Sequence, residues 1–124
     1  MATARLLTIR ERRDLREALL SDLTRVEGQC ASLARDLEEM AIGAENSNTD
    51  DEHDPEGMTT GFERAQLNAL LVQSERERRA LKAALDRVAE PGFGVCEHCG
   101  EFIGVERLLA LPATTRCVVC AGRA

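Results

Sequence analysis

The sequence has few aromatic residues and no long apolar segment. It contains no Trp and no Tyr, and its three Phe are Phe62, Phe93 and Phe102. A chain of 124 residues with so few aromatic side chains does not build a deep, aromatic-lined cleft around a large cofactor. No apolar run approaches the roughly 18 residues that a membrane span requires, so we expect no membrane segment. The N-terminus also lacks the apolar core of a secretory signal, which predicts a cytoplasmic protein.

Lys and Arg are absent from one internal stretch, residues 36–63, which holds ten acidic residues. Because the whole chain has a net charge of −6, this stretch carries −10 and the remainder +4. Such concentrated negative charge disfavours contact with a nucleic-acid backbone and favours a cation, a metal or a basic channel as the partner. Taken alone, the stretch is equally compatible with a solvated acidic loop that has no role.

Five cysteines occur in a protein expected in the reducing cytoplasm, where structural disulfides are rare. Four of them form two C-x-x-C pairs, Cys96 with Cys99 and Cys117 with Cys120, separated by 17 residues. Two residues between cysteines let one tight turn direct both thiolates at one ion, and Gly100 supplies the positive φ that such turns often need. The pattern predicts one structural zinc ion bound by these four cysteines.

Other interpretations of the cysteines fit less well. A thioredoxin-type redox pair needs a βαβ context, which this sequence lacks. An iron–sulfur cluster is disfavoured because the cysteine spacing matches neither common ferredoxin pattern. Catalytic zinc is disfavoured because four thiolates leave no open coordination position for water. His98, between two of the predicted ligands, is the alternative ligand. Cys30 lies in a helical apolar stripe, where a cysteine usually packs as a small apolar residue, and a redox or ligand role is the alternative there.

Two apolar stripes precede the cysteine motif. In the first, steps of three and four residues relate the apolar positions, which is the pattern of a coiled-coil seam. The second has the same spacing but is interrupted by Ser74 and Arg78. The first stripe comprises Leu15, Leu19, Leu23, Val26, Cys30, Leu33, Leu37, Met40 and Ala44, and the second comprises Leu67, Leu70, Leu71, Ser74, Arg78, Leu81, Leu85 and Val88.

The sequence between the stripes predicts a break. Gly, Asn and Ser gather over residues 42–50, residues 54–57 (Asp-Pro-Glu-Gly) are typical of a turn, and Pro91-Gly92 ends the second helix. Two helices of about 30 residues joined by a loop should fold back antiparallel. We therefore predict a mainly α protein, with a long antiparallel coiled-coil hairpin over residues 1–90, an acidic tip near residues 45–57 and a zinc finger over residues 91–124. We expect a monomer, and a four-helix bundle of two hairpins is the alternative.

The region around the cysteines resembles the DksA/TraR zinc-finger family. The family pattern is C-x-x-C-G, an Ile, an Arg-Leu pair, an Ala, a Pro and a second C-x-x-C, preceded by Phe or Tyr and Gly. The resemblance implies a bacterial or phage transcription regulator that binds RNA polymerase directly, without DNA contact. It also implies that the helical hairpin enters the polymerase secondary channel and brings acidic tip residues toward the active site. The matching residues are Phe93, Gly94, Cys96, Cys99, Gly100, Ile103, Arg107, Leu108, Ala110, Pro112, Cys117 and Cys120.

The resemblance assigns roles to individual residues. The family's tip motif, Asp-x-x-Asp-x-Ala, corresponds here to residues 51–56, with Glu in place of the final Ala. Asp51 and Asp54 are the expected contact residues, because they are three residues apart and can share one face of a turn. Asp50, Glu52 and Glu56 are expected to add negative field. Arg107 matches a family Arg that is either structural or polymerase-facing.

Two differences from the family argue against joint regulation by guanosine tetraphosphate. Members that respond to this nucleotide often carry Arg where this sequence has Leu111, and they continue into a basic helix, whereas this chain has four residues after Cys120.

We predict a non-enzymatic polymerase-binding regulator. The first alternative is a coiled-coil scaffold, held together by zinc, that binds another protein or itself. The second is a nucleic-acid-binding zinc finger, which the zero net charge of residues 91–124 disfavours. The third is an enzyme, for which the sequence shows no nucleophile–base pair.

Overall fold

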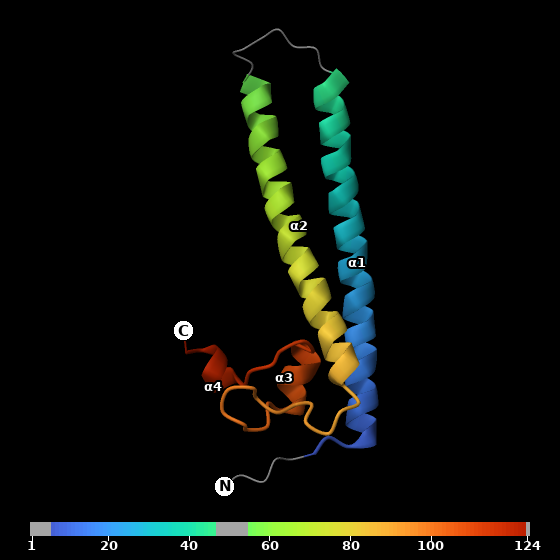
Figure 1. Cartoon of the computed structure of the whole chain (residues 1–124), viewed down its shortest axis with the longest axis vertical. Helices are drawn as coiled ribbons and strands as arrows, with labels where there is room; N and C mark the ends of the chain where they lie inside the picture. The colour runs from blue at the N-terminus through green and yellow to red at the C-terminus, as the bar shows by residue number, and fades with distance from the viewer. Residues whose placement is uncertain (1–5, 47–54, 124) are drawn as a thin grey trace. The chain divides into compact units, whose positions relative to one another are not determined.

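The structure, a computed structural model, describes residues 6–46 and 55–123, and only the backbone of residues 44–46 and 55–58. This part of the chain contains the helices α1 (Ile9–Asn46), α2 (Pro55–Arg87), α3 (Val105–Ala110) and α4 (Val118–Ala121) (Figure 1). The described residues contain no β-strand, and an isolated antiparallel bridge joins Val95 to Phe102. The predicted class is confirmed: the protein is mainly α, with a hairpin of two long helices and a small cysteine module. No helix in the described ranges is long and apolar enough to cross a membrane.

Helix α1 begins earlier than the apolar stripe alone predicts. The N–H of Thr8 donates to the Glu11 carboxylate at 2.9 Å, and the N–H of Glu11 donates to the Thr8 hydroxyl at 3.0 Å. This reciprocal pair is a capping box, which satisfies N–H groups that have no partner within the helix. With this start α1 reaches 38 residues, and α2 has 33.

The turn predicted over residues 54–57 is wrong from Pro55 onward. Helix α2 begins at Pro55 and includes Gly57. Proline is favoured at the first position of a helix because its φ suits the helix and the N–H that it lacks would have no partner there. Helix α1 ends at Asn46, inside the stretch of residues 42–50 where the break is predicted.

The chain divides into two compact units, and in each of them a segment of α1 lies beside an oppositely directed segment of α2. Unit 1 consists of Met1–Thr24 and Arg79–Ala124, and unit 2 of Arg25–Arg78. The apolar core of unit 1 includes both helices and the cysteine module. Its buried apolar side chains outside the cysteines include Leu7, Leu15, Leu19, Leu81, Ala84, Val88, Phe93 and Leu108, whereas unit 2 buries Val26, Cys30 and the polar Ser74.

The first predicted stripe faces inward along its described length, since every member from Leu15 to Met40 is buried or half-buried. Cys30 is 8% exposed and packs as a core residue, as predicted. The second stripe needs two corrections. Leu70 is 51% exposed, because the seam passes one residue further on, at the half-buried Leu71, and each residue turns the helix by about 100°. Ala84, which the predicted stripe omits, is fully buried.

Candidate metal centre

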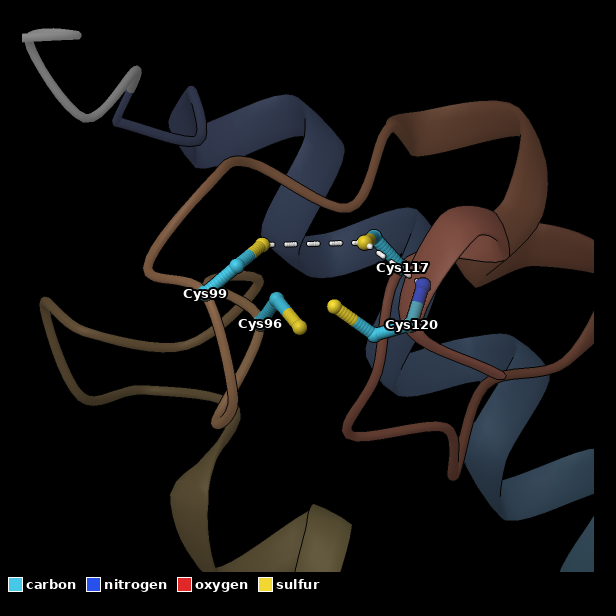
Figure 2. Close-up of side chains that lie close together, drawn as sticks. All are labelled: Cys96, Cys99, Cys117 and Cys120. Carbon is cyan, nitrogen blue, oxygen red and sulfur yellow. Dashed lines mark hydrogen bonds between the residues drawn. The ribbon is translucent and has the colours of Figure 1, made fainter. Parts of the chain in front are cut away.

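Four cysteine sulfurs meet in the C-terminal module (Figure 2). The Sγ atoms of Cys96, Cys99, Cys117 and Cys120 all lie within 4.8 Å of one another. Cys99 is exposed, and the other three are buried. The Sγ atoms of Cys99 and Cys117 are 3.7 Å apart. Zinc–thiolate bonds of about 2.3 Å in a tetrahedron place neighbouring sulfurs about 3.8 Å apart, so this spacing fits a single zinc ion.

The first cysteine pair lies on a tight turn. The N–H of Gly100 donates to the carbonyl oxygen of Cys96 at 3.0 Å, and the N–H of Cys96 donates to the carbonyl oxygen of Glu101 at 2.8 Å. Gly100 has a φ of +78°, a conformation that residues with a Cβ atom rarely adopt. The predicted need for glycine after the second cysteine is therefore confirmed. The turn directs the sulfurs of Cys96 and Cys99 toward the second pair (Figure 2).

The second cysteine pair is positioned by the start of a short helix. Cys117 is the N-cap of α4, and its Sγ accepts a hydrogen bond from the N–H of Cys120 at 3.5 Å. The helical turn brings both sulfurs to the side that faces the first pair (Figure 2). Ile103 packs against the three buried cysteines. This apolar contact shields the group from water on that side.

Three interactions join the two cysteine turns and α3. The N–H of Glu97 donates to the carbonyl oxygen of Thr115 at 2.8 Å. Nε of Arg116 donates to the Glu97 carboxylate at 3.2 Å, and this contact, together with Thr115, lowers the pKa of Glu97. Nε of Arg107 donates to the carbonyl oxygen of Arg116 at 3.1 Å. Arg107 thus makes a structural contact just before Cys117, while a polymerase contact of this residue stays a prediction.

The cysteines of the group differ in their affinity for protons. Hydrogen bonds from backbone N–H groups, first that of Cys117, lower the pKa of Cys96 to about 6, and the backbone N–H of Cys120 lowers the pKa of Cys117. Burial, followed by interactions with the neighbouring thiols, raises the pKa of Cys120 to about 12. Four thiolates in this space repel one another unless a cation lies among them. The charge of the group therefore suits a doubly charged metal ion.

The donor set fits structural zinc. Over residues 6–46 and 55–123, no other group of three or more metal-binding side chains comes together, and His98, the alternative ligand, is exposed and outside the group. Four thiolates complete a tetrahedral shell and leave no position for a reacting water molecule. The predicted cofactor, one structural zinc ion, is confirmed by this geometry and by the family match given below.

Leu7 and Gly94 contribute to the packing of the module, and neither belongs to a periodic pattern in the sequence. Leu7 is 6% exposed although it precedes α1. A Cβ atom on Gly94 would lie 3.3 Å from Cδ1 of Leu7 and 3.3 Å from Cε2 of Phe102. With a φ of +96°, Gly94 allows these side chains to meet over the backbone that leads to Cys96. An apolar residue directly before a capping box is the one signal in the sequence that could have indicated Leu7.

Arg12 is a further residue of unit 1 that the sequence pattern did not predict. Its Nη1 atom donates to the carbonyl oxygens of Val88 and Glu90, both at 2.7 Å. The chain from Val88 leads directly into the cysteine module, so Arg12 fixes the backbone at the entrance of that module. An arginine on a charged helix carries no distinguishing signal in the sequence.

The predicted tip residues Asp51, Glu52 and Asp54 lie outside the described residues. Glu56 belongs to the first turn of α2, and its side chain is also outside the described part. The role of these four carboxylates therefore stays a prediction.

Comparison with known proteins identifies the module. Residues 91–124 match the family model of the prokaryotic dksA/traR C4-type zinc finger. The chain is 32% identical over 69 residues to the RNA polymerase-binding transcription factor DksA of Escherichia coli K12. The matched region covers 53% of this chain and 46% of that protein. It is 37% identical over 70 residues to DksA of Haemophilus influenzae, with 54% and 47% covered. The chain thus matches about half the length of these curated relatives.

A solved structure shares the fold. The structure of transcription factor DksA2 from Pseudomonas aeruginosa superimposes with a TM-score of 0.75, covers 93% of this chain and 83% of that chain, and has 21% sequence identity. At this identity the likeness shows the fold alone. The likeness agrees with the predicted fold, and the family match of residues 91–124 confirms the resemblance of the cysteine motif to the DksA/TraR family.

Proposed function

We propose that this protein, whose C-terminal module is a DksA/TraR zinc finger, is a transcription regulator that binds RNA polymerase directly. The helical hairpin enters the polymerase secondary channel, the acidic tip points toward the active site, and the zinc finger is the structural base. The observation that carries the proposal is the zinc-finger match of residues 91–124 in a chain with a long helical hairpin. The relatives named RNA polymerase-binding transcription factor support the same partner.

In this proposal the zinc ligands are Cys96, Cys99, Cys117 and Cys120. Their convergence within 4.8 Å supports the assignment. Because the four thiolates close the shell, the zinc holds the two turns together and offers no site for catalysis. The protein acts by binding and is not an enzyme.

The acidic stretch of residues 36–63 is the part proposed to act on the polymerase. Its ten carboxylates and absence of Lys and Arg suit a basic channel. An active site that transfers nucleotides holds Mg²⁺, and a nearby carboxylate can perturb the environment of that metal or contact basic residues that gate the site. Asp51 and Asp54 are proposed to make the specific contacts, and Glu52 and Glu56 to add to the negative field.

Several partners are not part of the proposal. Residues 91–124 have no net charge, so we propose no direct contact with DNA. Leu111 replaces the Arg that guanosine tetraphosphate-responsive members often carry, and we propose that this nucleotide is not a ligand. We propose a monomer that works in the cytoplasm, where bacterial polymerase is found.

Capture of purified core RNA polymerase tests the proposal. A photo-crosslinking residue at Asn68, an exposed position of α2, should give an adduct with a polymerase subunit that lines the channel. The same residue at Arg123, in the zinc finger, should crosslink outside the channel. Failure to capture polymerase, with retention of other cellular proteins, would favour the scaffold alternative. Capture of duplex DNA alone would favour the nucleic-acid-binding alternative.

A further inference from the structure

The helices of unit 2 are less well buried than those of unit 1. In the described part of unit 2, buried side chains end at Cys30 on α1 and at Ser74 on α2. Every side chain of residues 31–43 and 59–73 is at least partly exposed, including the stripe residues Leu33 and Leu67. In unit 1, by contrast, Leu15 and Leu19 are fully buried. Apolar burial, the main source of stability for a helical hairpin, is thus concentrated in unit 1.

A groove of about 440 Å³ opens between the helices of unit 2 where the second stripe is interrupted. Ser74 and Gln73 of α2 line it opposite Ser32 and Leu33 of α1. Arg25 and Glu77 bridge the same groove through a 3.3 Å ion pair, and their side chains are 52% and 45% exposed. Polar side chains beside an open groove and an exposed ion pair contribute little to holding two helices together.

Besides Gly57 in the first turn of α2, three glycines lie further inside the helices of unit 2, namely Gly28 and Gly43 in α1 and Gly61 in α2. A Cβ atom on any of them would meet no neighbouring atom within 4 Å, so packing does not require glycine at these positions. Glycine inside a helix weakens it relative to alanine, because the backbone loses more freedom on folding. The helical segments of unit 1, residues 9–24 and 79–87, contain no glycine.

We propose that unit 2 is a separately opening part of the hairpin. Its segments of α1 and α2 open and close reversibly while unit 1 and its zinc site stay folded. Sparse burial, the polar groove and the three unneeded glycines all weaken the same unit, and a region of few buried contacts opens at lower free energy than the core. The use of this opening rests on the proposed function: when unit 2 opens, its helices can adjust to a narrow polymerase channel, and binding then closes the unit.

Hydrogen exchange followed by mass spectrometry tests the proposal on the zinc-loaded full chain. Peptides from residues 31–43 and 59–73 should exchange at least about tenfold faster than peptides from residues 9–24 and 79–87, after correction for intrinsic rates. Equal protection along both helices would overturn the proposal, because the hairpin would then open as one unit.

A variant with alanine in place of all three glycines sharpens the test. Gly28→Ala, Gly43→Ala and Gly61→Ala together should slow exchange in unit 2 by about two- to fivefold for each glycine and leave unit 1 unchanged. The matched control is Ser21→Ala, which improves helix propensity at an exposed position of unit 1 and should not slow exchange in unit 2. If the triple variant slows both units equally, the two units are not separate and the proposal fails.

Addition of core RNA polymerase separates this proposal from the proposed function. Polymerase should slow exchange in unit 2 more than in unit 1. If the free protein shows the expected difference but polymerase changes nothing, the polymerase function fails and the opening unit stands. If polymerase protects the hairpin but the free protein exchanges uniformly, the function stands and the opening unit fails.

Discussion

Arg12 on α1 donates a hydrogen bond at 2.7 Å to the carbonyl oxygen of Val88, which lies 76 residues further along the chain. The same guanidinium donates to the carbonyl oxygens of Glu90 at 2.7 Å and Pro91 at 3.5 Å. These carbonyls follow the last residue of α2, Arg87, beyond the helical hydrogen-bond ladder, and that of Glu90 also accepts from the N–H of Phe93 at 3.1 Å. A cation is also favoured at a helix C-terminus by the helix dipole. Arg12 therefore ends α2 and sets the path of the chain into the zinc module.

Replacing Arg12 should destabilise unit 1. We expect Arg12→Ala to lower the free energy of unfolding by about 2 kcal/mol, because two carbonyl groups lose a charged donor at a partly exposed site. Arg12→Lys should recover part of this loss, since one ammonium nitrogen can donate to the carbonyl oxygens of Val88 and Glu90 but lysine has no second nitrogen to donate to Pro91. The control Arg13→Ala, at an exposed position, should change stability by less than about 0.5 kcal/mol. Urea unfolding followed by circular dichroism gives these values, and equal effects at both positions would contradict the role of Arg12.

Zinc content checks the ligand assignment. The purified protein should hold one zinc ion per chain, and Cys99→Ser or Cys117→Ser should release it, because three thiolates bind the metal much more weakly than four. Cys30→Ala is the matched control: this cysteine lies in unit 2, outside the sulfur group, and its loss should leave the zinc content unchanged. Elemental analysis of each variant gives the answer. A folded wild-type protein with four free thiols in the module and no metal would refute the assignment.

Zinc affinity should fall as the pH is lowered. The metal binds thiolates, so each cysteine that carries a proton in the metal-free protein must release it. Cys96, with its pKa lowered to about 6, is already a thiolate at neutral pH and becomes protonated only below about 6. A plot of the logarithm of the zinc affinity against pH should therefore steepen below pH 6 and have a smaller slope above it. Competition with a chromophoric chelator measures this affinity, and a pH-independent value would contradict the prediction.

Much of the fold was readable from the sequence because it depends on local spacing. The stripe from Leu15 to Met40 predicts an inward-facing helix side, since the 3.6-residue period places these positions on one side. The C-x-x-C spacing predicts the sulfur group, because one turn can direct both thiolates to one ion. Gly100 was predictable for the same reason: the turn needs a positive φ. The capping box of Thr8 and Glu11, which marks where α1 starts, also depends on local spacing, but the prediction from the apolar stripe did not include it.

The features that could not be predicted depend on residues far apart in the sequence. Arg12 pairs with carbonyl groups 76 or more residues away, and nothing near Arg12 in the chain marks this partner. Ala84 is fully buried and Leu70 is half exposed. The way α1 and α2 pack against each other, and not the size of a side chain, decides which positions are covered. Pro55 begins a helix where the surrounding Asp and Gly suggest a turn, since local residue preferences for turns and for helix starts overlap.

Truncation of seam residues should reveal the difference in packing along α1. Leu19→Ala should cost about 2–5 kcal/mol, because the fully buried side chain leaves a cavity. Leu33→Ala, at a half-buried position, should cost about 1–2 kcal/mol. The control Glu38→Ala, an exposed residue off the stripe, should cost less than about 0.5 kcal/mol. Chemical unfolding measures the three values, and a Leu33 variant as destabilised as the Leu19 variant would show that unit 2 is as tightly packed as unit 1.

The last prediction concerns the acidic residues proposed to act on the polymerase. Asp51→Asn together with Asp54→Asn keeps side-chain shape and removes two negative charges. This variant should still bind RNA polymerase, because the remaining length of the hairpin and the zinc finger are unchanged, but it should lose most of its effect on transcription in vitro. The control Glu38→Gln with Glu39→Gln removes two charges from exposed positions of α1 in the same acidic stretch and should retain the effect. If the aspartate variant regulates as well as the wild type, steric blockage of the channel remains as the mechanism. If both variants lose the effect equally, the total charge of the stretch is decisive and the two aspartates have no specific role.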